Sequence, residues 1–261
     1  GPVSPCVTMM RRRFGRCPRG TSCQTGCPLC SPKWIVASKN LKIKKMKRKI
    51  VILGATGTVG SKISENLLSD GHHVTLIARN IERLKKFQGM GAEIISGDVN
   101  DVEILTNAFK NADSAFLILP DNVKAENTRD YQRLVTGNFI TAIEKSGIKH
   151  IVNMNSLGSH MHEGNGIMGG TGEQVVRLNQ LTDVNVLHIR SAYFMENFLR
   201  TIALVKNKGI NGTAADGDHS IPMVAPKDAA KIAAGHLADV DFEGKSIHAV
   251  MGGSKYTMRE F

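Results

Sequence analysis

The chain has 261 residues, of which 34 are Lys or Arg and 23 are Asp or Glu, and its formal net charge is +11. This length is enough for one α/β domain with a sizeable core. Residues 1–49 hold thirteen of the basic residues and no acidic one, so 21 basic and 23 acidic residues follow and carry a net charge of −2. The positive charge therefore belongs to the start of the chain, which excludes a broad cationic surface for nucleic acid on the folded domain.

Residues 1–45 mix Arg, Pro, Gly, Ser and Cys without apolar periodicity, so we expect a disordered basic extension. All five cysteines lie in this extension, and their spacing matches neither a paired zinc site nor the usual ferredoxin run. A domain without cysteine needs no oxidising compartment, which favours a cytoplasmic setting. No apolar stretch here is long enough for a membrane span, so we expect no membrane contact. We interpret Met46 as the natural start, with a transit peptide or a nucleic-acid arm as alternatives for the extension.

From residue 49 onward, strand and helix patterns alternate, which is typical of a parallel sheet covered on both faces. The sequence therefore predicts a doubly wound Rossmann domain over residues 46–190. Its expected strands are residues 49–53, 73–78, 92–96, 114–119, 150–154 and 184–190, and its expected helices are residues 58–69, 81–87, 102–110, 124–146 and 171–181.

The pattern changes after residue 190. A helix is predicted over residues 193–206, an extended piece over 221–224, a helix over 229–237 with Asp228 as its cap, and a strand over 245–251. Thr257 and Glu260 have the spacing of a capping box, which predicts a helix that the sequence does not complete. Residues 191–261 are therefore expected to form a small, truncated C-terminal substrate lobe.

A glycine turn, with Gly54, Gly57 and Gly60 at three-residue spacing, follows the first strand and precedes the first helix. Glycines let backbone N–H groups approach a pyrophosphate, and the helix N-terminus adds favourable partial charge. The spacing differs from the standard G-x-G-x-x-G fingerprint, and a glycine turn without a ligand is the alternative. The predicted pyrophosphate-binding residues are Gly54, Thr56, Gly57, Thr58 and Val59.

The end of the second strand is where such folds usually select between NAD and NADP. An acidic residue there accepts hydrogen bonds from the ribose 2′-hydroxyl, whereas an arginine pairs with a 2′-phosphate. This chain has Arg79 followed by Asn80, both predicted to bind the cofactor, with Lys85 and Lys86 shortly after. The pattern favours NADP(H) over NAD(H); a solvated surface arginine is the alternative.

Three further strand ends complete the predicted cofactor site, because ligands of open sheets lie beyond the carboxyl ends of strands. Gly97, Asp98 and Val99 are expected near the adenine, although Asp98 fits equally well as a helix cap. Leu119 and Pro120, together with Asn155 and Ser156, are expected to flank the nicotinamide, with ordinary turn chemistry as the alternative.

No catalytic residue can be assigned from the sequence. The Tyr-x-x-x-Lys motif of short-chain dehydrogenases is absent, because Val135, Asn197 and Glu260 stand four residues after the three tyrosines. Tyr193 could approach a substrate, although a core or rim aromatic is the favoured reading. His160 and His162 lie in a Gly- and His-rich loop that could cover a nicotinamide, but such a pair without a third ligand does not indicate a metal site.

Taken together, these segments resemble the NmrA-like family of atypical short-chain dehydrogenases. The resemblance covers residues 47–261, and it rests on the glycine turn, Ala78-Arg79-Asn80, Gly97-Asp98, residues 147–152, Arg190 with residues 193–198, and residues 228–230. It implies NADP(H) in the glycine cleft and a substrate lobe near Tyr193 and Phe194. The chain departs from reductases of the family in having no lysine in the helix after the fifth strand, and Ser191 where a proline is common.

Two functions follow from this resemblance. The first is an NADPH-dependent reductase of a small carbonyl or quinone substrate. The second is a non-catalytic redox sensor whose nucleotide occupancy controls a protein partner, and the missing motif and lysine favour it. An enzyme of the epimerase type is a third reading, which the same missing tyrosine motif weakens.

Overall fold

The computed structural model describes residues 46–260 except 123, 162–167 and 211–215. The predictions for residues 1–45, including the disordered extension and the five cysteines, lie outside the described residues, as does His162. All statements below concern the described part of the chain.

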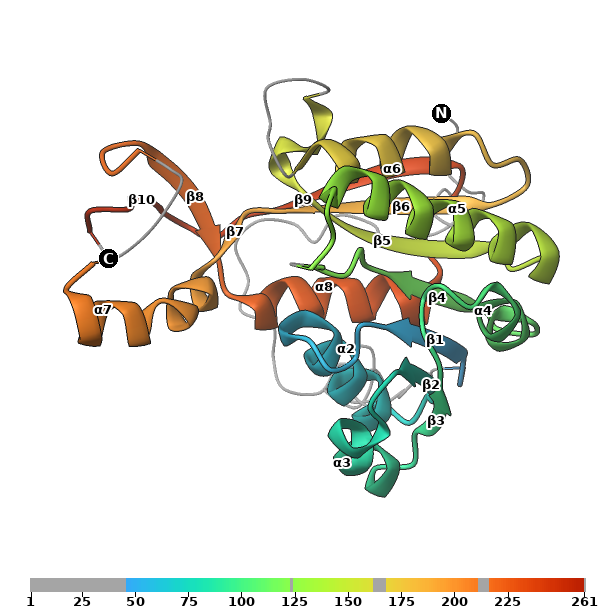
Figure 1. Cartoon of the computed structure of the whole chain (residues 1–261). Coiled ribbons are helices and arrows are strands. Elements are labelled where there is room, and N and C mark those ends of the chain that lie inside the picture. The colour runs from blue at the N-terminus through green and yellow to red at the C-terminus, as the bar shows by residue number, and fades with distance from the viewer. Residues whose placement is uncertain (1–45, 123, 162–167, 211–215, 261) are drawn as a thin grey trace, which may run out of the picture. The chain divides into compact units, whose positions relative to one another are not determined.

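A seven-stranded parallel sheet forms the centre of the fold, in the order β3-β2-β1-β4-β5-β6-β9 (Figure 1). The chain runs outward from β1 to β3 and then crosses back to place β4 on the other side of β1. This reversal makes the carboxyl ends of β1 and β4 the place where such a sheet binds ligands. The strands are β1 Lys49–Leu53, β2 His73–Ala78, β3 Glu93–Ser96, β4 Ser114–Leu117, β5 His150–Ser156, β6 Asn185–Ser191 and β9 Lys245–Val250.

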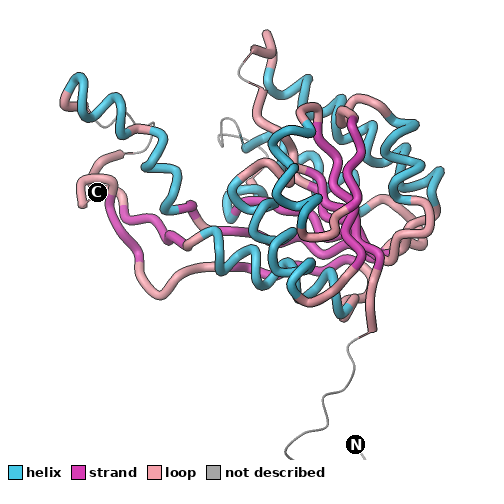
Figure 2. Tube along the Cα trace, turned by 90° about the horizontal axis from the view of Figure 1, so that it is seen from below, coloured by secondary structure: helices cyan, strands magenta, loops and turns pink. Residues whose placement is uncertain are grey.

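Helices cover both faces of this sheet, as Figure 2 shows with helices in cyan beside strands in magenta. One face carries α2 and α8, which pack on each other and on the sheet, and the other carries α4, α5 and α6. The doubly wound α/β fold predicted from the sequence is thus present. The helices are α2 Thr58–Ser69, α3 Lys85–Gly89 after the 3-10 turn Ile81–Leu84, α4 Val102–Phe109, α5 Thr128–Ser146, α6 Gly169–Asn179 and α8 Pro226–Asp239.

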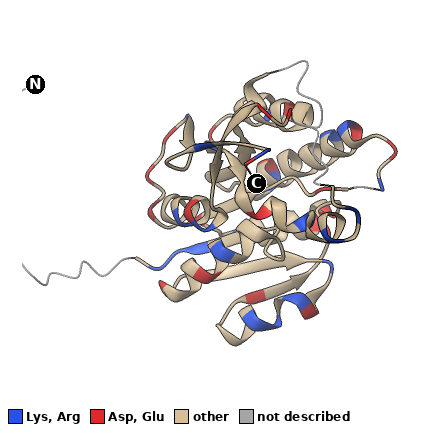
Figure 3. Cartoon of the chain, turned by 90° about the vertical axis from the view of Figure 1, so that its left-hand side faces the viewer, with Lys and Arg blue, Asp and Glu red and all other residues tan. Residues whose placement is uncertain are grey.

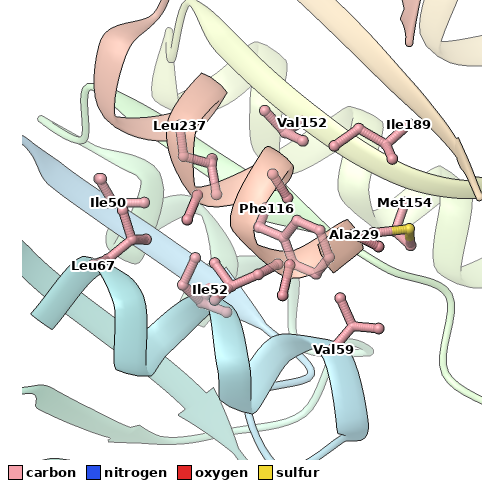
Figure 4. Close-up of a cluster of buried hydrophobic side chains, with 14 of the residues drawn as sticks. Ile50, Ile52, Val59, Leu67, Phe116, Val152, Met154, Ile189, Ala229 and Leu237 are labelled. Carbon is pink, nitrogen blue, oxygen red and sulfur yellow. The ribbon is translucent and has the colours of Figure 1, made fainter. Parts of the chain in front are cut away.

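The two helical layers exist because successive residues of each strand point to opposite faces. In β1, Ile50 and Ile52 join the cluster under α2 and α8, whereas Val51 and Leu53 join the cluster under α4 and α5. Figure 4 shows the first cluster, in which Phe116 of β4 lies between side chains of α2 and α8. Strands buried on both faces explain the continuous apolar runs in the sequence.

A second, three-stranded sheet is built from the last part of the chain, in the order β10-β8-β7. Its strands are β7 Tyr193–Phe194, β8 Ser220–Val224 and β10 Lys255–Thr257, and α7 (Ile202–Lys208) follows a 3-10 helix over Met195–Arg200. Figures 1 and 2 both show this group to one side of the main sheet.

The structure corrects the sequence predictions in this last part. The helix expected over 193–206 is wrong at its start, because Tyr193 and Phe194 pair as a strand with Met223 and Val224. The helix expected after Thr257 is also not formed among the described residues. Thr257 belongs to β10 and pairs with Ser220 of β8, and the Glu260 carboxylate accepts a hydrogen bond from the backbone N–H of Thr257. The capping-box contact is therefore made without a helix among the described residues.

The predicted cap Asp228 and the alternative role of Asp98 as a cap are also wrong. Ala225 caps α8 and Pro226 opens it, so Asp228 lies in the first turn, where its charge favours the helix dipole. Asp101, not Asp98, caps α4, since its Oδ1 accepts from the backbone N–H groups of Glu103 and Ile104.

Candidate functional site: a nucleotide site at the carboxyl edge of the sheet

The glycine turn lies at the switch point of the sheet, directly against the end of β4. Gly54 has φ of +72°, a conformation that L side chains rarely adopt, and a Cβ there would lie 2.6 Å from Cγ2 of Ile118. The turn is closed by a hydrogen bond of 2.9 Å from the Gly57 N–H to the Gly54 carbonyl. Gly54, Gly57 and Thr58 are exposed, so this backbone is open to a ligand.

The amino end of α2 has no side-chain cap among the described residues. Gly57 is the N-cap residue, and in the described chain no side chain caps the helix and no acidic residue stands in its first turn. Such an end favours an anion. Gly60 brings α2 against the turn, because a Cβ at this position would lie 2.3 Å from the Gly54 carbonyl oxygen. The cradle therefore fits a diphosphate, and side chains at Gly54 or Gly60 would disrupt it.

Arg79 lies at the end of β2 and is largely exposed. Its Nε lies 3.5 Å from Oδ2 of Asp98, which follows β3. The other carboxylate oxygen of Asp98 accepts from the backbone N–H of Asn100 at 2.9 Å and from its side-chain Nδ2 at 2.8 Å. Asn80 has a structural task, since its Oδ1 accepts from the Glu82 N–H and opens the next helical turn. The predicted adenosine-binding residues of β2 and β3 therefore meet at one place.

Tyr131 also lies at this place, although the sequence analysis assigned it no role in the site. Tyr131 lies in the first turn of α5 and is partly buried against the core. Burial raises the pKa of Tyr131, Asp98 raises it further, and Arg79 lowers it. These two charges therefore lie within electrostatic reach of the phenol. The sequence signal for this position was a tyrosine in the first turn of the helix that follows β4, because that helix begins at the carboxyl edge of the sheet.

Gly97 and Val99 complete the β3 end. A Cβ at Gly97 would lie 2.8 Å from Cγ2 of Ile104, so this glycine allows α4 to approach the strand. The Val99 carbonyl accepts from Nδ2 of Asn138 in α5. Both residues therefore position the loop that carries Asp98.

The predicted nicotinamide-side residues lie at the ends of neighbouring strands. Leu119 and Pro120 follow β4, which ends at Leu117, two residues earlier than expected. Asn155 and Ser156 belong to β5, which is two residues longer than expected. The Asn155 side chain donates to the Thr171 carbonyl of α6 and accepts from the Ser156 N–H, so it ties the strand end to α6.

Tyr193 and Phe194 follow β6 in the short strand β7. Tyr193 is 37% exposed, and its ring lies 5.6 Å from that of Phe198. His160, in the turn after β5, has its Nδ1 2.8 Å from the Leu157 carbonyl, which leaves Nε2 as the outer nitrogen. These side chains come from the segments that follow β5 and β6, whereas Arg79 follows β2 on the other side of β1.

A buried polar network lies beneath this edge, between β5, β6 and α6. His188 Nε2 lies 2.9 Å from Oδ1 of Asn179, and its Nδ1 lies 3.2 Å from Nδ2 of Asn153. These partners match a neutral imidazole with its proton on Nε2. Burial, together with the charges of Arg190 and Lys245, lowers the pKa of His188 to about 4. The network is therefore a neutral structural element rather than an acid or base at neutral pH.

Other site classes find no support in the described residues. Among them no group of three or more His, Cys, Asp or Glu side chains is placed to hold a metal ion. No helix in the described ranges is long and apolar enough to cross a bilayer. Basic and acidic residues are interspersed over the face seen in Figure 3.

Comparison with known proteins agrees with a nucleotide site. Residues 54–175, from the glycine turn into α6, match a family described as NAD(P)H-binding. Among curated proteins, the photosystem II assembly factor Ycf39 of Synechocystis is 27% identical over 107 residues, which are 40% of this chain and 32% of that protein. An NAD(P)H azoreductase of Xenophilus azovorans is 22% identical over 163 residues, which are 61% of this chain and 53% of the azoreductase. The chain thus spans about a third and about half of the length of these two relatives.

A solved structure shows the same fold. The NADPH-dependent quinone oxidoreductase QOR2 of Escherichia coli, complexed with NADPH, superposes with a TM-score of 0.67 at 24% identity, covering 81% of this chain and 72% of that one. The region matched by the NAD(P)H-binding family begins at Gly54, the first residue of the glycine turn. The chain therefore has the Rossmann fold of this structure, and residues 54–175 are similar to a family described as NAD(P)H-binding.

Proposed function

We propose that this protein is an NmrA-like NADP(H)-binding protein of the cytoplasm and that it acts as an NADPH-dependent reductase of a small carbonyl or quinone substrate. The observation that carries the proposal is the open glycine turn at the switch point, with Arg79 at the neighbouring strand end. An arginine fork fits a 2′-phosphate, which NADP(H) has and NAD(H) lacks.

The proposal gives each predicted residue a task. Backbone groups of Gly54, Thr56, Gly57, Thr58 and Val59 hold the pyrophosphate. Arg79 holds the 2′-phosphate, and Asn80 lies beside it on the cofactor side of the same strand end. Gly97, Asp98 and Val99 lie beside the adenine, and Leu119, Pro120, Asn155 and Ser156 line the nicotinamide side. The bound nucleotide supplies the hydride, so the chain has to bind, orient and shield the reactants. Tyr193 and Phe194 are the proposed substrate contacts.

Two relatives support a reductase by their names alone. One is an NAD(P)H azoreductase, and the other is a quinone oxidoreductase whose structure was solved with NADPH. The quinone in the second name is the substrate class that we extend to the present chain as part of the proposal.

A second function, a non-catalytic nucleotide sensor with a protein partner, is favoured by the first turn of α6. This turn contains Gly170 and Gly172 and no lysine. A Cβ on Gly170 would lie 1.8 Å from Oε1 of Gln132, and one on Gly172 would lie 2.7 Å from the Ser159 carbonyl oxygen. The turn thus packs too tightly for a catalytic side chain at either glycine. An assembly factor among the relatives is a protein whose name implies partners rather than turnover.

Nucleotide titration of the purified full chain by calorimetry tests the binding part. We expect Arg79→Asp to weaken NADPH binding by about 30-fold or more, because a charge-assisted contact becomes a repulsion, and NADH binding by about threefold at most. Gly57→Val should abolish binding of both nucleotides, since its side chain enters the diphosphate position. Equal losses for both nucleotides in Arg79→Asp would reject the phosphate assignment.

Oxidation of NADPH in the presence of a series of quinones separates the two functions. Turnover that Gly57→Val abolishes would establish the reductase. Tight NADPH binding without turnover on any quinone would leave the sensor as the function.

A further inference from the structure

Resting on the proposed NADP(H) site, we infer that Asp98 is a specificity-determining residue that weakens the preference for NADP(H), because its anchored carboxylate competes with the 2′-phosphate for Arg79. The site would then accept both nucleotides, with Arg79 favouring the phosphate and Asp98 opposing it. The two nucleotides differ in the 2′-phosphate, so we place their discrimination where that phosphate would lie, at the pair of Arg79 and Asp98.

The carboxylate of Asp98 is fixed in place. Its Oδ1 accepts two hydrogen bonds from Asn100, one from the backbone and one from the side chain, at 2.9 and 2.8 Å. The side chain of Asp98 is 33% exposed. Both contacts come from a residue two positions away in the same loop, so they hold the carboxylate in the orientation in which its other oxygen faces Arg79.

Arg79 is held much less firmly. Its side chain is 78% exposed, and its ion pair with Asp98 is made from Nε at 3.5 Å. This contact is long for a charge-assisted hydrogen bond, so it orients the guanidinium only weakly. A positioning role, in which Asp98 holds the arginine ready for the phosphate, would need a shorter or bidentate pair.

The consequence is electrostatic. A phosphate that contacts the Arg79 guanidinium lies within a Debye length of the Asp98 carboxylate, and both are anions. Their repulsion opposes binding of NADPH but not of NADH, which carries hydroxyls at this position. For two anions within a Debye length of each other in a largely aqueous setting, the repulsion corresponds to roughly a threefold to tenfold loss of NADPH affinity.

The test is the ratio of NADH to NADPH dissociation constants, measured by calorimetry on the full chain and on Asp98→Asn. Asparagine keeps an oxygen for Asn100 and removes the charge. We expect the ratio to rise roughly threefold to tenfold at low salt, chiefly through tighter NADPH binding, and the gain to shrink as salt screens the charges. Using a ratio cancels any contact of Asp98 with the adenine, which both nucleotides share.

Asp101→Asn is the matched control. It removes the same charge three residues later, and asparagine still caps α4, so the ratio should stay unchanged. A ratio that is unchanged or lower in Asp98→Asn would overturn the inference, and a lower one would show that Asp98 orients Arg79 for the phosphate. A wild-type chain that binds neither nucleotide would instead overturn the proposed function itself.

Discussion

The first βαβ unit and the segment from Met195 to Lys208 contrast in how much of each is buried. In the unit, Ile63 and Leu67 of α2 are fully buried, and they pack on β1 and β2. In the segment, neither the 3-10 helix nor α7 contains a buried residue, and Leu199 is 63% exposed. The contrast teaches that the sheet fixes the geometry of the candidate nucleotide site. The conformation of the segment from Met195 to Lys208 depends instead on local backbone preferences.

The accuracy of the sequence predictions follows the same contrast. The bounds of β1, α2 and β2 were predicted without error, because apolar periodicity is strong where a helix buries one face. Between residues 193 and 206 an apolar pattern also exists, but no residue of the 3-10 helix or of α7 is buried. The segment therefore begins as a strand and continues as a 3-10 helix.

The largest expected effect is that of Gly60→Ala, in the tightest contact of the first unit. The added Cβ would lie 2.3 Å from the Gly54 carbonyl oxygen and 2.7 Å from its carbon, both backbone atoms that cannot move without opening the turn. We expect a loss of about 3 kcal/mol in the free energy of unfolding, together with loss of nucleotide binding. Urea denaturation and titration with NADPH measure the two effects.

Gly235→Ala is the control for this substitution. Gly235 lies within α8, and a Cβ there would meet no atom within 4 Å. We expect this change to stabilise the protein by up to about 1 kcal/mol, because alanine favours the helix. If the two substitutions changed the free energy of unfolding equally, helix propensity would explain the effect of Gly60→Ala, and the close approach of α2 to the turn would not.

The second largest expected effect is a loss of stability at acidic pH, caused by protonation of the buried His188. The pKa of His188 in the folded state is about 4, below its usual value near 6.5, so the unfolded chain binds more protons. Stability should therefore be complete above pH 6.5 and should fall as the pH decreases toward 4, by about 2 to 3 kcal/mol at pH 4.5. Urea denaturation between pH 7.5 and 4.5 measures this slope.

His188→Asn isolates the contribution of the imidazole, because carboxyl groups with lowered pKa values, such as Glu173 beside Arg133, also lose stability in acid. The variant should be less stable at pH 7.5, where Asn153 and Asn179 lose a partner, but its stability should depend less on pH. Parallel pH profiles for the two proteins would contradict a neutral buried His188.

The candidate site was only partly predictable from the sequence. The glycine turn and Arg79 follow from residue type and order, since strand ends meet at one edge of a parallel sheet. The pair of Arg79 with Asp98, the anchoring by Asn100 and the neighbourhood of Tyr131 depend on how loops after β3 and β4 approach each other. No periodicity encodes such contacts between loops. The sequence accordingly allowed two interpretations of Asp98, as an adenine contact or as a helix cap. The second is wrong, because Asp101 caps α4.

The smallest expected effect, and the sharpest test of the contrast between the two regions, is that of replacing exposed apolar residues of the lobe. Leu199→Ser and Val205→Ser should each change the free energy of unfolding by less than about 0.5 kcal/mol, because these side chains are 63% and 43% exposed and little apolar area returns to water. Leu67→Ala, in the buried face of α2, should cost about 3 kcal/mol in the same denaturation experiment. A loss above about 1 kcal/mol from either serine substitution would show that the lobe is packed in solution. The nucleotide site would then share its stability with the lobe, and the sheet alone would not fix its geometry.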